Sequence, residues 1–404
     1  MSSDDLRAAF LRYVCQTSPE PLGITVARAH GASLWDNEGR EYLDLLSGMG
    51  VASLGHGNPE VLAALRAQME RHLHVMVYGE LVQETQVRLA ERLAALCPGD
   101  LSTVYFTSSG AEAIEGALKL ARKATARSRL MAFSGGYHGD TMGALSLCDN
   151  AAYRTPFEPL LGDVEFLAFD DLQDLHRIDE RVAAVVVEPI QGEGGVRVPG
   201  ADFLPAVRAR CDAVGALLVL DEVMTGWART GTWFACEQWK VVPDILVLAK
   251  ALGGGLPLGA FIASPALMRT LSHDPPLAHV TTFGGHPLSC AAGLAALDVG
   301  VREQLPMRAA EVGAAWRRRL AQSKGAVLCE VRGRGLLIGL ELATPEHTRR
   351  FCRAALDRGL ILNWTLHRDT VVRLAPPLTI DAADSERALA AIEASLAVAA
   401  VEKR

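Results

Sequence analysis

The middle of the chain alternates short apolar runs with longer amphipathic segments. Residues 182–187 (VAAVVV), 216–220 (ALLVL) and 244–249 (DILVLA) each have the length of a strand. A helical pattern at 203–214 separates the first two runs, and continuous apolar runs are typical of strands that are buried on both faces. The pattern therefore predicts a mainly parallel sheet with helices on both sides, which is an α/β fold.

Each of these three runs ends at a polar side chain. Glu188 follows the first run, Asp221 the second and Lys250 the third. A strand-end turn or a surface charge is the ordinary explanation of any one of them. Three in one region favour a binding site, because ligands bind at the carboxyl edge of open α/β sheets. Lys250 is the only charged residue of segment 245–260, and an ammonium buried without a partner is costly.

Two further segments combine small residues with polar groups. An apolar run at 104–107 leads into SSGAEA (108–113) and a helical pattern, so free N–H groups and the helix dipole could cradle a phosphate. Ordinary serine capping is the alternative. The segment GGYHGD (135–140) sets Tyr137 and His138 among glycines that would let a flat ligand approach. A tight turn with a packed tyrosine is the alternative there.

Taken together, these features match the parts of one cofactor. Residues 109–111 would bind a phosphate, and Tyr137 would cover a flat ring. Asp221 would keep a basic ring nitrogen protonated, and Lys250 would condense with an aldehyde as a Schiff base. Pyridoxal 5'-phosphate has all of these parts, and a lysine and a carboxylate are its usual protein partners.

Composition narrows the classes of function. The 404-residue chain is 50% hydrophobic and 22% charged, with a formal net charge of −7. The length predicts two or three domains with sizeable cores. The acidic balance gives no footprint for nucleic acid or for an anionic membrane surface. Eight cysteines without a CxxC pair, and an amino terminus without a signal-peptide pattern, predict a cytoplasmic protein with reduced thiols.

Two uncharged stretches, 251–268 and 275–297, are long enough to raise the question of a membrane span. Glycines and prolines interrupt the first and polar residues the second, so we expect buried loops and helix starts. His72 and His74 form an HxH pair without an evident third ligand, which favours a structural role. We expect no metal site and no membrane partner.

The two ends of the chain differ from its middle. The turn at 36–39 (DNEG) between apolar segments predicts a small hairpin. The glycines of 333–339 miss the dinucleotide fingerprint by one position and predict a turn between strands. We expect an amino-terminal segment of a small domain at 1–45, a large cofactor-binding domain at 46–291 and a carboxyl-terminal small domain at 292–404.

An ordered series of motifs gives the chain a family resemblance. It resembles the class III pyridoxal-phosphate-dependent aminotransferases of fold type I, and especially acetylornithine, ornithine and 4-aminobutyrate aminotransferases. This resemblance implies a large domain with a mainly parallel seven-stranded sheet and a smaller α+β domain from both termini. The motifs are LDLLSG (43–48), SSGAEA (108–113), YHGDT (137–141), VEPIQGEGG (187–195), LDEVMTGWARTG (220–231), LAKALGGGLPLGA (248–260), TTFGGHPLSCAAG (281–293) and RLAPPLTI (373–380).

The resemblance also implies roles for individual residues. Thr282 would reach the cofactor phosphate of the neighbouring subunit, so the active unit would be a homodimer or a higher homo-oligomer. Val223 would pack on the ring face opposite Tyr137. Arg373 would bind the substrate carboxylate, and Glu193 would pair with it while an ω-amine donor is bound. The expected cofactor-binding set is Ser109, Gly110, Ala111, Tyr137, His138, Glu188, Asp221, Val223, Lys250 and Thr282, with Lys250 and Asp221 catalytic and Arg373, Glu193 and Met49 binding substrate.

Three positions depart from the family pattern. Asp140 stands where relatives that use 2-oxoglutarate carry arginine, and it cannot hold a distal carboxylate. Met49 stands where ornithine enzymes have a tyrosine, and Met224 replaces a frequent glutamine. The YHGDT form is similar to that of diaminopelargonate aminotransferases, but the tryptophan pair of those enzymes is missing.

The sequence therefore predicts ping-pong transfer of an amino group from an ω-amino acid or diamino acid to a 2-oxo acid. Within enzymes, the alternatives are a diaminopelargonate-type or other amine transaminase and an aminomutase or decarboxylase of the same fold. Arg373 favours transamination over the aminomutase. The alternative outside enzymes is a catalytically silent cofactor-binding module, and the presence of both Lys250 and Asp221 argues against it.

Overall fold

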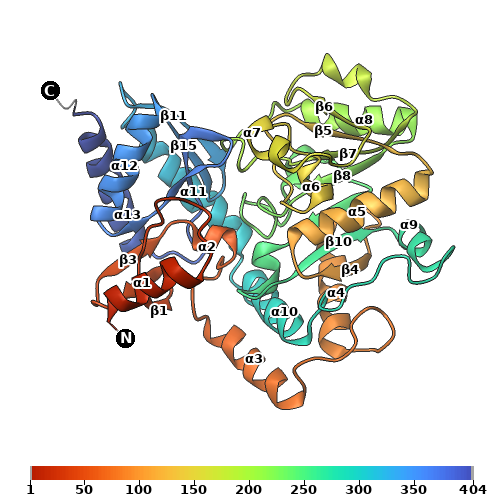
Figure 1. The fold of residues 1–404 in the computed structure, drawn as a ribbon, viewed down its shortest axis with the longest axis horizontal. Coiled ribbons are helices and arrows are strands. Elements are labelled where there is room, and N and C mark those ends of the chain that lie inside the picture. Colours follow the sequence, from red (N-terminus) through yellow and green to blue (C-terminus); the bar gives the residue numbers. More distant parts are fainter. Residues whose placement is uncertain (1, 402–404) are drawn as a thin grey trace.

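A computed structural model describes residues 2–401 of the chain. A central sheet with helices on both faces fills one half of the molecule, and the two ends of the chain together build the other half (Figure 1). Among the helices of residues 2–401, none has both the length and the apolar character that crossing a bilayer requires.

The central sheet has seven strands in the order β4-β10-β9-β8-β7-β5-β6. Neighbouring strands pair in parallel except at β10, which is antiparallel to both β9 and β4. This arrangement confirms the predicted mainly parallel sheet. The strands are β4 (Thr103–Thr107), β5 (Arg129–Phe133), β6 (Val164–Leu167), β7 (Val182–Val187), β8 (Leu217–Asp221), β9 (Ile245–Leu248) and β10 (Gly259–Ala263).

Strand β10 corrects one expectation from the sequence. Stretch 251–268 was expected to hold only buried loops and helix starts, but its residues 259–263 form a fully buried strand. Phe261 pairs with Val247 on one side and with Tyr105 on the other. A glycine-flanked run of five residues has no alternation that marks it as a strand, so only its two neighbours in the sheet define it.

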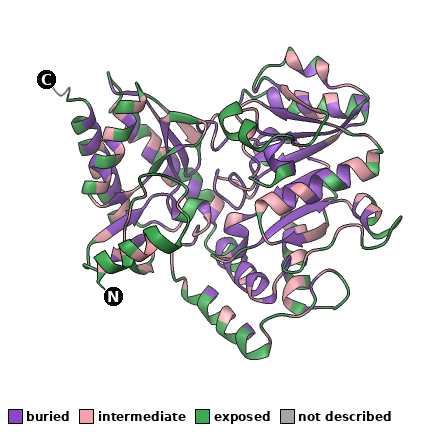
Figure 2. Ribbon diagram, in the orientation of Figure 1, coloured by how far each residue is buried: buried purple, intermediate pink, exposed green. Residues whose placement is uncertain are grey.

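Helices cover both faces of the central sheet. Helix α5 (Gly110–Thr125) packs on one face, and α4 (Glu84–Leu96), α8 (Phe203–Val214) and α10 (Pro287–Arg302) contribute to the core on the other. Successive strand residues point to opposite faces, so Val186 packs in the α5 cluster and Val185 in the α8 cluster. Figure 2 shows the strands as a continuous buried layer.

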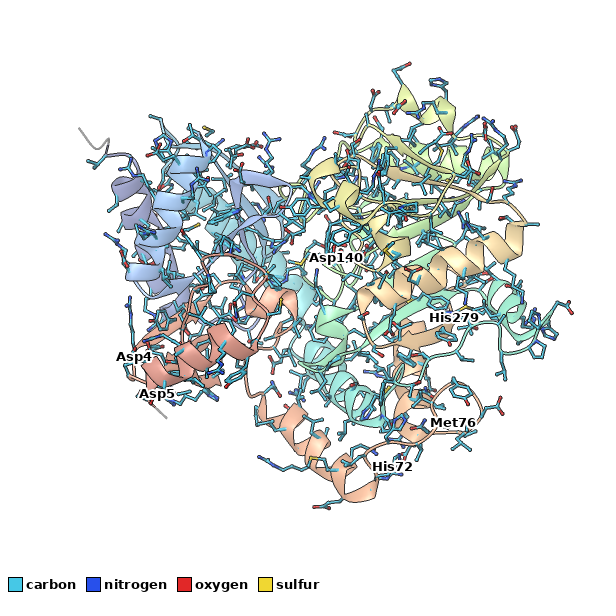
Figure 3. All side chains as sticks on the ribbon, in the orientation of Figure 1. Asp4, Asp5, His72, Met76, Asp140 and His279 are labelled. Carbon is cyan, nitrogen blue, oxygen red and sulfur yellow. The ribbon has the colours of Figure 1, made fainter. Side chains whose placement is uncertain are left out.

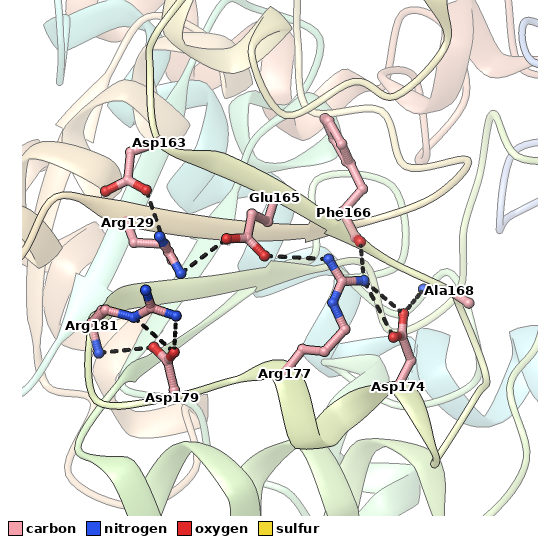
Figure 4. A network of polar contacts seen from close by, with 9 residues as sticks. All are labelled: Arg129, Asp163, Glu165, Phe166, Ala168, Asp174, Arg177, Asp179 and Arg181. Atoms are coloured by element: carbon pink, nitrogen blue, oxygen red, sulfur yellow. Dashed lines mark hydrogen bonds and ion pairs between the residues drawn. The ribbon is translucent and has the colours of Figure 1, made fainter.

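The β6 edge of the sheet carries a network of charges (Figure 4). Arg129 lies 2.9 Å from both Asp163 and Glu165, and Arg177 bridges Glu165 at 3.3 Å to Asp174 at 3.2 Å. Partly exposed pairs of this kind at the protein surface each contribute only ~0–1 kcal/mol. Their charges instead oppose the addition of a foreign strand to this edge.

Two four-stranded sheets lie in the other half of the molecule, and both ends of the chain contribute strands to the first of them. The hairpin predicted around residues 36–39 is present, and Leu43 pairs in parallel with Leu360, near the other end of the chain. The turn predicted within residues 333–339 joins two antiparallel strands. The strand order in the first sheet is β1 (Val26–His30), β2 (Ser33–Asp36), β3 (Glu41–Asp44) and β13 (Leu360–Ile361). The strand order in the second sheet is β11 (Leu328–Arg334), β12 (Leu337–Leu342), β15 (Arg368–Leu374) and β14 (Asn363–Thr365).

A separate hydrophobic core holds this half together, and it includes Leu43, Trp316 and Phe351. Helix α10 runs across the predicted boundary at 291/292, and the domain boundaries stay predictions. The other α-helices are α1 (Ser3–Tyr13), α2 (Ser47–Gly50), α3 (Pro59–Arg71), α6 (Met142–Leu145), α7 (Ala151–Arg154), α9 (Pro265–Met268), α11 (Leu305–Ala321), α12 (Pro345–Asp357) and α13 (Ala382–Ala399). The 3₁₀ helices are η1 (Thr155–Phe157), η2 (Asp174–Arg177), η3 (Ala235–Trp239), η4 (Lys250–Gly253) and η5 (Arg269–Ser272).

Candidate active site

The carboxyl edge of the central sheet opens onto a cavity of about 530 Å³. Asp221 is the last residue of β8, Glu188 directly follows β7, and Lys250 stands two residues beyond β9. Parallel strands present their carboxyl ends at one edge, so these three side chains meet there. Most of the predicted site residues line the cavity: Ser109, Gly110, Ala111, Tyr137, His138, Glu188, Glu193, Asp221, Val223, Lys250 and Arg373.

The side-chain amine of Lys250 forms no ion pair with a carboxylate among residues 2–401. Its Nζ lies 3.6 Å from the sulfur of Met224. Burial, followed by the nearby Arg373 guanidinium, lowers the pKa of Lys250 below its ordinary value. The backbone of Lys250 has φ +51°, a left-handed conformation that non-glycine residues adopt at some cost and that clusters at functional sites.

Asp221 is held by one hydrogen bond on each oxygen. Its Oδ2 lies 2.7 Å from Nδ1 of His138, and its Oδ1 accepts from the backbone N–H of Val223 at 3.0 Å. Burial opposes a charged imidazole, but the hydrogen bond and the charge of Asp221 outweigh it and raise the pKa of His138. The pair thus presents a fixed carboxylate at the end of β8.

The amino terminus of α5 forms another wall of the cavity. Ser109 caps this helix by accepting the N–H of Glu112 at 3.2 Å. Gly110 lies where a Cβ would meet the side chain of Val223 at 3.1 Å. Gly139 has φ +121° and approaches so closely that a Cβ would stand 2.6 Å from the Cβ of Ala111. These close contacts fix the backbone around the first turn of a long helix, whose free N–H groups can bind an anionic group.

Tyr137 and Glu188 are joined through the backbone. Glu188 accepts the N–H of Tyr137 at 3.0 Å and the N–H of Gly192 at 2.8 Å. Burial raises the pKa of Glu188 to about 7. Burial also raises the pKa of Tyr137, whose hydroxyl donates to Oδ2 of Asp140 at 2.9 Å.

Arg373, on β15, forms an ion pair with Glu193 at the cavity. The other oxygen of Glu193 accepts the backbone N–H of Leu366 at 2.8 Å. Burial opposes ionisation of Glu193, but the charge and hydrogen bonds of Arg373 and the Leu366 N–H outweigh it, so the pKa of Glu193 is lowered. Met49 lies outside the cavity lining, with its sulfur 3.7 Å from the Arg373 guanidinium.

Two predicted features lie away from this cavity. Thr282 is exposed and does not line the cavity of its own chain. His74 stacks on His286, with ring centroids 5.3 Å apart. In the part of the chain that the structure describes, no three His, Cys, Asp or Glu side chains gather as metal ligands.

Arg229 lies within the LDEVMTGWARTG motif, and no role was predicted for it from the sequence. Its buried guanidinium donates to the carbonyls of Pro376 at 2.6 Å and Leu336 at 3.2 Å, and to the hydroxyl of Ser53 at 3.1 Å. Burial and the charge of Arg373 lower the pKa of Arg229 to about 9. Its place inside the motif 220–231 was the only signal that the sequence offered.

The group that fits this donor set has a phosphate, a flat ring with a basic nitrogen and an electrophilic carbon. The helix terminus at Ser109 suits the phosphate, and the fixed carboxylate of Asp221 suits a protonated ring nitrogen. The amine of Lys250 suits the electrophilic carbon. Pyridoxal phosphate meets all three requirements.

Comparisons with known proteins agree with this donor set. Residues 14–396 match the family model described as aminotransferase class-III. The chain is 44% identical to a putrescine aminotransferase of Pectobacterium atrosepticum, over 92% of this chain and 82% of that protein. It is also 44% identical to an acetylornithine aminotransferase of Methanopyrus kandleri, over 92% of this chain and 94% of that one.

Solved structures give the same result for the fold. An ornithine aminotransferase from Toxoplasma gondii superposes with a TM-score of 0.92 at 34% identity, covering 98% of this chain and 95% of that chain. An (S)-enantioselective omega-transaminase from Thermomicrobium roseum also has a TM-score of 0.92, at 32% identity, covering 99% of this chain and all of that chain, 100%.

Proposed function

We propose that this chain, which belongs to the class III aminotransferases, takes its amino group from an ω-amino acid or a diamino acid and passes it to a 2-oxo acid. The observation that carries this proposal is that one cavity holds both the amine of Lys250 and the Glu193–Arg373 ion pair. The names of the relatives support it, since putrescine and acetylornithine aminotransferases act on terminal amines.

Membership in the family makes the chain a pyridoxal-phosphate-dependent aminotransferase. When bound, the cofactor supplies an electrophilic carbon that binds amines and a ring that accepts electron density from the carbon next to them. We propose that Lys250 holds it covalently and that residues 109–111 hold its phosphate. Tyr137 and Val223 would cover the two ring faces, and Glu188 holds Tyr137 by accepting its backbone N–H.

We propose that Lys250 also moves the proton of the reaction. With the cofactor bound, the Nζ of Lys250 would remove a proton from the amine-bearing carbon of the donor. The lowered pKa of Lys250 supports this role, because a base must be neutral before it can accept a proton. Asp221 keeps the ring nitrogen protonated, and His138 holds Asp221 in place.

Arg373 is proposed to bind the carboxylate of the 2-oxo acid acceptor, and Met49 borders this position. While a donor with its amine at the far end is bound, Glu193 neutralises Arg373, as it does in this structure. When the acceptor enters, Glu193 leaves Arg373 and the carboxylate takes its place. The two half-reactions alternate in a single cavity, which is ping-pong kinetics.

Two further proposals concern the state of the protein. We propose a homodimer in which Thr282 contributes to the cavity of the partner subunit, supported by its exposure away from its own cavity. We propose a cytoplasmic location, supported by eight cysteines that are all free. Light scattering of the purified protein tests the first of these, and fractionation of cells tests the second.

The central proposal is tested with a panel of amino donors. Putrescine, ornithine, acetylornithine and 4-aminobutyrate are each offered with pyruvate or with 2-oxoglutarate, and the new amino acid is measured. We expect transfer from terminal amines to exceed transfer from α-amino acids such as alanine. A clear preference for α-amino acids as donors would overturn the ω-amine assignment, although the family membership would stand.

A further inference from the structure

Asp140 differs from every other carboxylate that lines the cavity. Glu193 pairs with Arg373, Asp221 pairs with His138, and Glu188 accepts two backbone N–H groups. Within residues 2–401, the Asp140 carboxylate accepts a single hydrogen bond, from the Tyr137 hydroxyl, and has no cationic partner.

The position of Asp140 suits it to meet an incoming ligand. It is exposed, it lines the cavity, and it lies between the two halves of the molecule (Figure 3). The close approach of Gly139 to Ala111 fixes this segment against the amino terminus of α5. The Tyr137 hydroxyl engages Oδ2 at 2.9 Å and leaves the remaining lone pairs of the carboxylate free.

We propose that Asp140 binds the second ammonium of a donor that carries two free amino groups, such as a diamine or an unblocked diamino acid. This inference rests on the proposed function and narrows its substrate class. One amine would react at the cofactor beside Lys250, and the other remains an ammonium that donates hydrogen bonds to the Asp140 carboxylate. An acylated second amine is neutral and loses this contact.

The ion pair between Glu193 and Arg373 also favours a diamine as the donor. A diamine has no carboxylate, so Glu193 stays paired with Arg373 as in this structure. Among the lining carboxylates that the structure describes, Asp140 and Glu188 have no cationic partner, and Glu188 already accepts two backbone N–H groups. Asp140 is therefore the carboxylate that remains for the distal ammonium.

The experiment compares putrescine with N-acetylputrescine, each with pyruvate as acceptor, on the holoenzyme. In the wild type we expect a higher kcat/KM for putrescine. Asp140→Asn keeps the shape and removes the charge, so the ratio of the two kcat/KM values should fall roughly ten- to a hundredfold, mainly through KM for putrescine. Asp140→Glu should restore part of the ratio.

The matched control is Asp369→Asn, an exposed aspartate on the same strand as Arg373 that does not line the cavity. It should keep the wild-type ratio. An unchanged ratio in Asp140→Asn, an equal loss on both donors, or a wild-type preference for the acetylated donor would each overturn the inference. A wild type that transfers from no terminal amine would instead refute the proposed function, so the two failures are distinct.

A second variant, Asp140→Arg, tests whether position 140 can be changed to favour a distal carboxylate. Asp140→Arg places a cation where we infer that a cation binds, so KM for putrescine should rise at least tenfold while 2-oxoglutarate improves relative to pyruvate. If Asp140→Arg changes neither preference, position 140 does not contact the distal end of the substrate, and the inference is wrong.

Discussion

The Nδ1 atom of His138 lies 2.7 Å from Oδ2 of Asp221, and both side chains are buried. An ionised carboxylate can only accept, so His138 donates this hydrogen bond. With the Val223 N–H on the other oxygen, Asp221 cannot rotate away from the cavity. A carboxylate fixed in this way stabilises a cationic ring nitrogen without reorganising.

Removing this charge should therefore slow the reaction without preventing cofactor binding. We expect Asp221→Ala to lower kcat by roughly a hundred- to a thousandfold. His138→Asn keeps a hydrogen-bond donor and should cost less. Steady-state rates on one donor, together with the visible absorption of the bound cofactor, check both. Near-wild-type turnover of Asp221→Ala would show that another group holds the ring nitrogen.

Lys250→Ala should abolish turnover, because the chain loses both its covalent anchor and its base. Some cofactor should still bind through the phosphate and ring contacts, which dialysis and absorption measure. In the wild type, borohydride reduction followed by peptide mapping should find the pyridoxyl group on Lys250. Lys240 and Lys119 serve as internal controls, and label on either one would contradict the assignment.

Arg373 and Glu193 should act on carboxylates in opposite ways. A charge-assisted carboxylate contact is worth ~1.5–3 kcal/mol, so Arg373→Ala should raise KM for carboxylate substrates roughly ten- to a hundredfold. Arg368→Ala, on the same strand but outside the cavity, is the control. Glu193→Ala should shift preference towards α-amino acids, because Arg373 is then always free. Equal effects of Arg373→Ala on carboxylates and on a monoamine would refute its role.

The lowered pKa of Glu193 makes a prediction about acid stability. A carboxyl whose pKa is lower in the folded chain than in the unfolded chain stabilises the fold above its unfolded pKa. That contribution is lost as pH falls through the folded value. The difference in Tm between wild type and Glu193→Gln should therefore be largest above the ordinary glutamate pKa of about 4.3 and shrink as pH falls through the lowered pKa of the folded chain. A difference that grows on acidification would contradict this sign.

Gly313 gives a prediction about packing. A Cβ at this position of α11 would stand 1.8 Å from the carbonyl oxygen of Gly335, in the turn between β11 and β12. Gly313→Ala should destabilise the fold by roughly 1–3 kcal/mol or more, because backbone must move. Gly325→Ala is the control, since no atom lies within 4 Å of its Cβ position. Thermal unfolding measures the Tm of both variants, and equal Tm values would refute the contact between Gly313 and Gly335.

The order of motifs and the long apolar runs were sufficient to predict the mainly parallel sheet and the residues at its carboxyl edge. Strand β7 is buried throughout, so its sequence carries a continuous apolar signal. Strand β10 is also buried throughout, but its short run GAFIA begins at a glycine and follows the glycine- and proline-rich segment 253–258, so its pairing with β4 and β9 is what identifies it. Local pattern predicts an element when the apolar run stands clear of such residues, and it fails when distant partners define the element.

The same distinction applies to the site. Lys250 and Asp221 follow apolar runs and could be selected from the sequence. The contacts between Glu193 and Leu366, and between Arg229 and Pro376, join segments far apart in the chain. The spacing of residues along the sequence does not predict such contacts. The lone hydrogen bond of Asp140 also needed coordinates, because its neighbours in space are what leave it without a cation.

The parallel pairing of Leu43 with Leu360 also affects the order in which parts of the fold can form during translation. The ribosome completes residues 103–263, which hold the whole central sheet, well before it reaches residue 360. The central sheet can therefore begin to fold during translation, whereas β3 must wait for a partner made near the end. The amino-terminal hairpin would then spend most of synthesis with an unpaired edge. Closing this long-range contact is expected to be a late and slow step, because contacts distant in sequence form slowly.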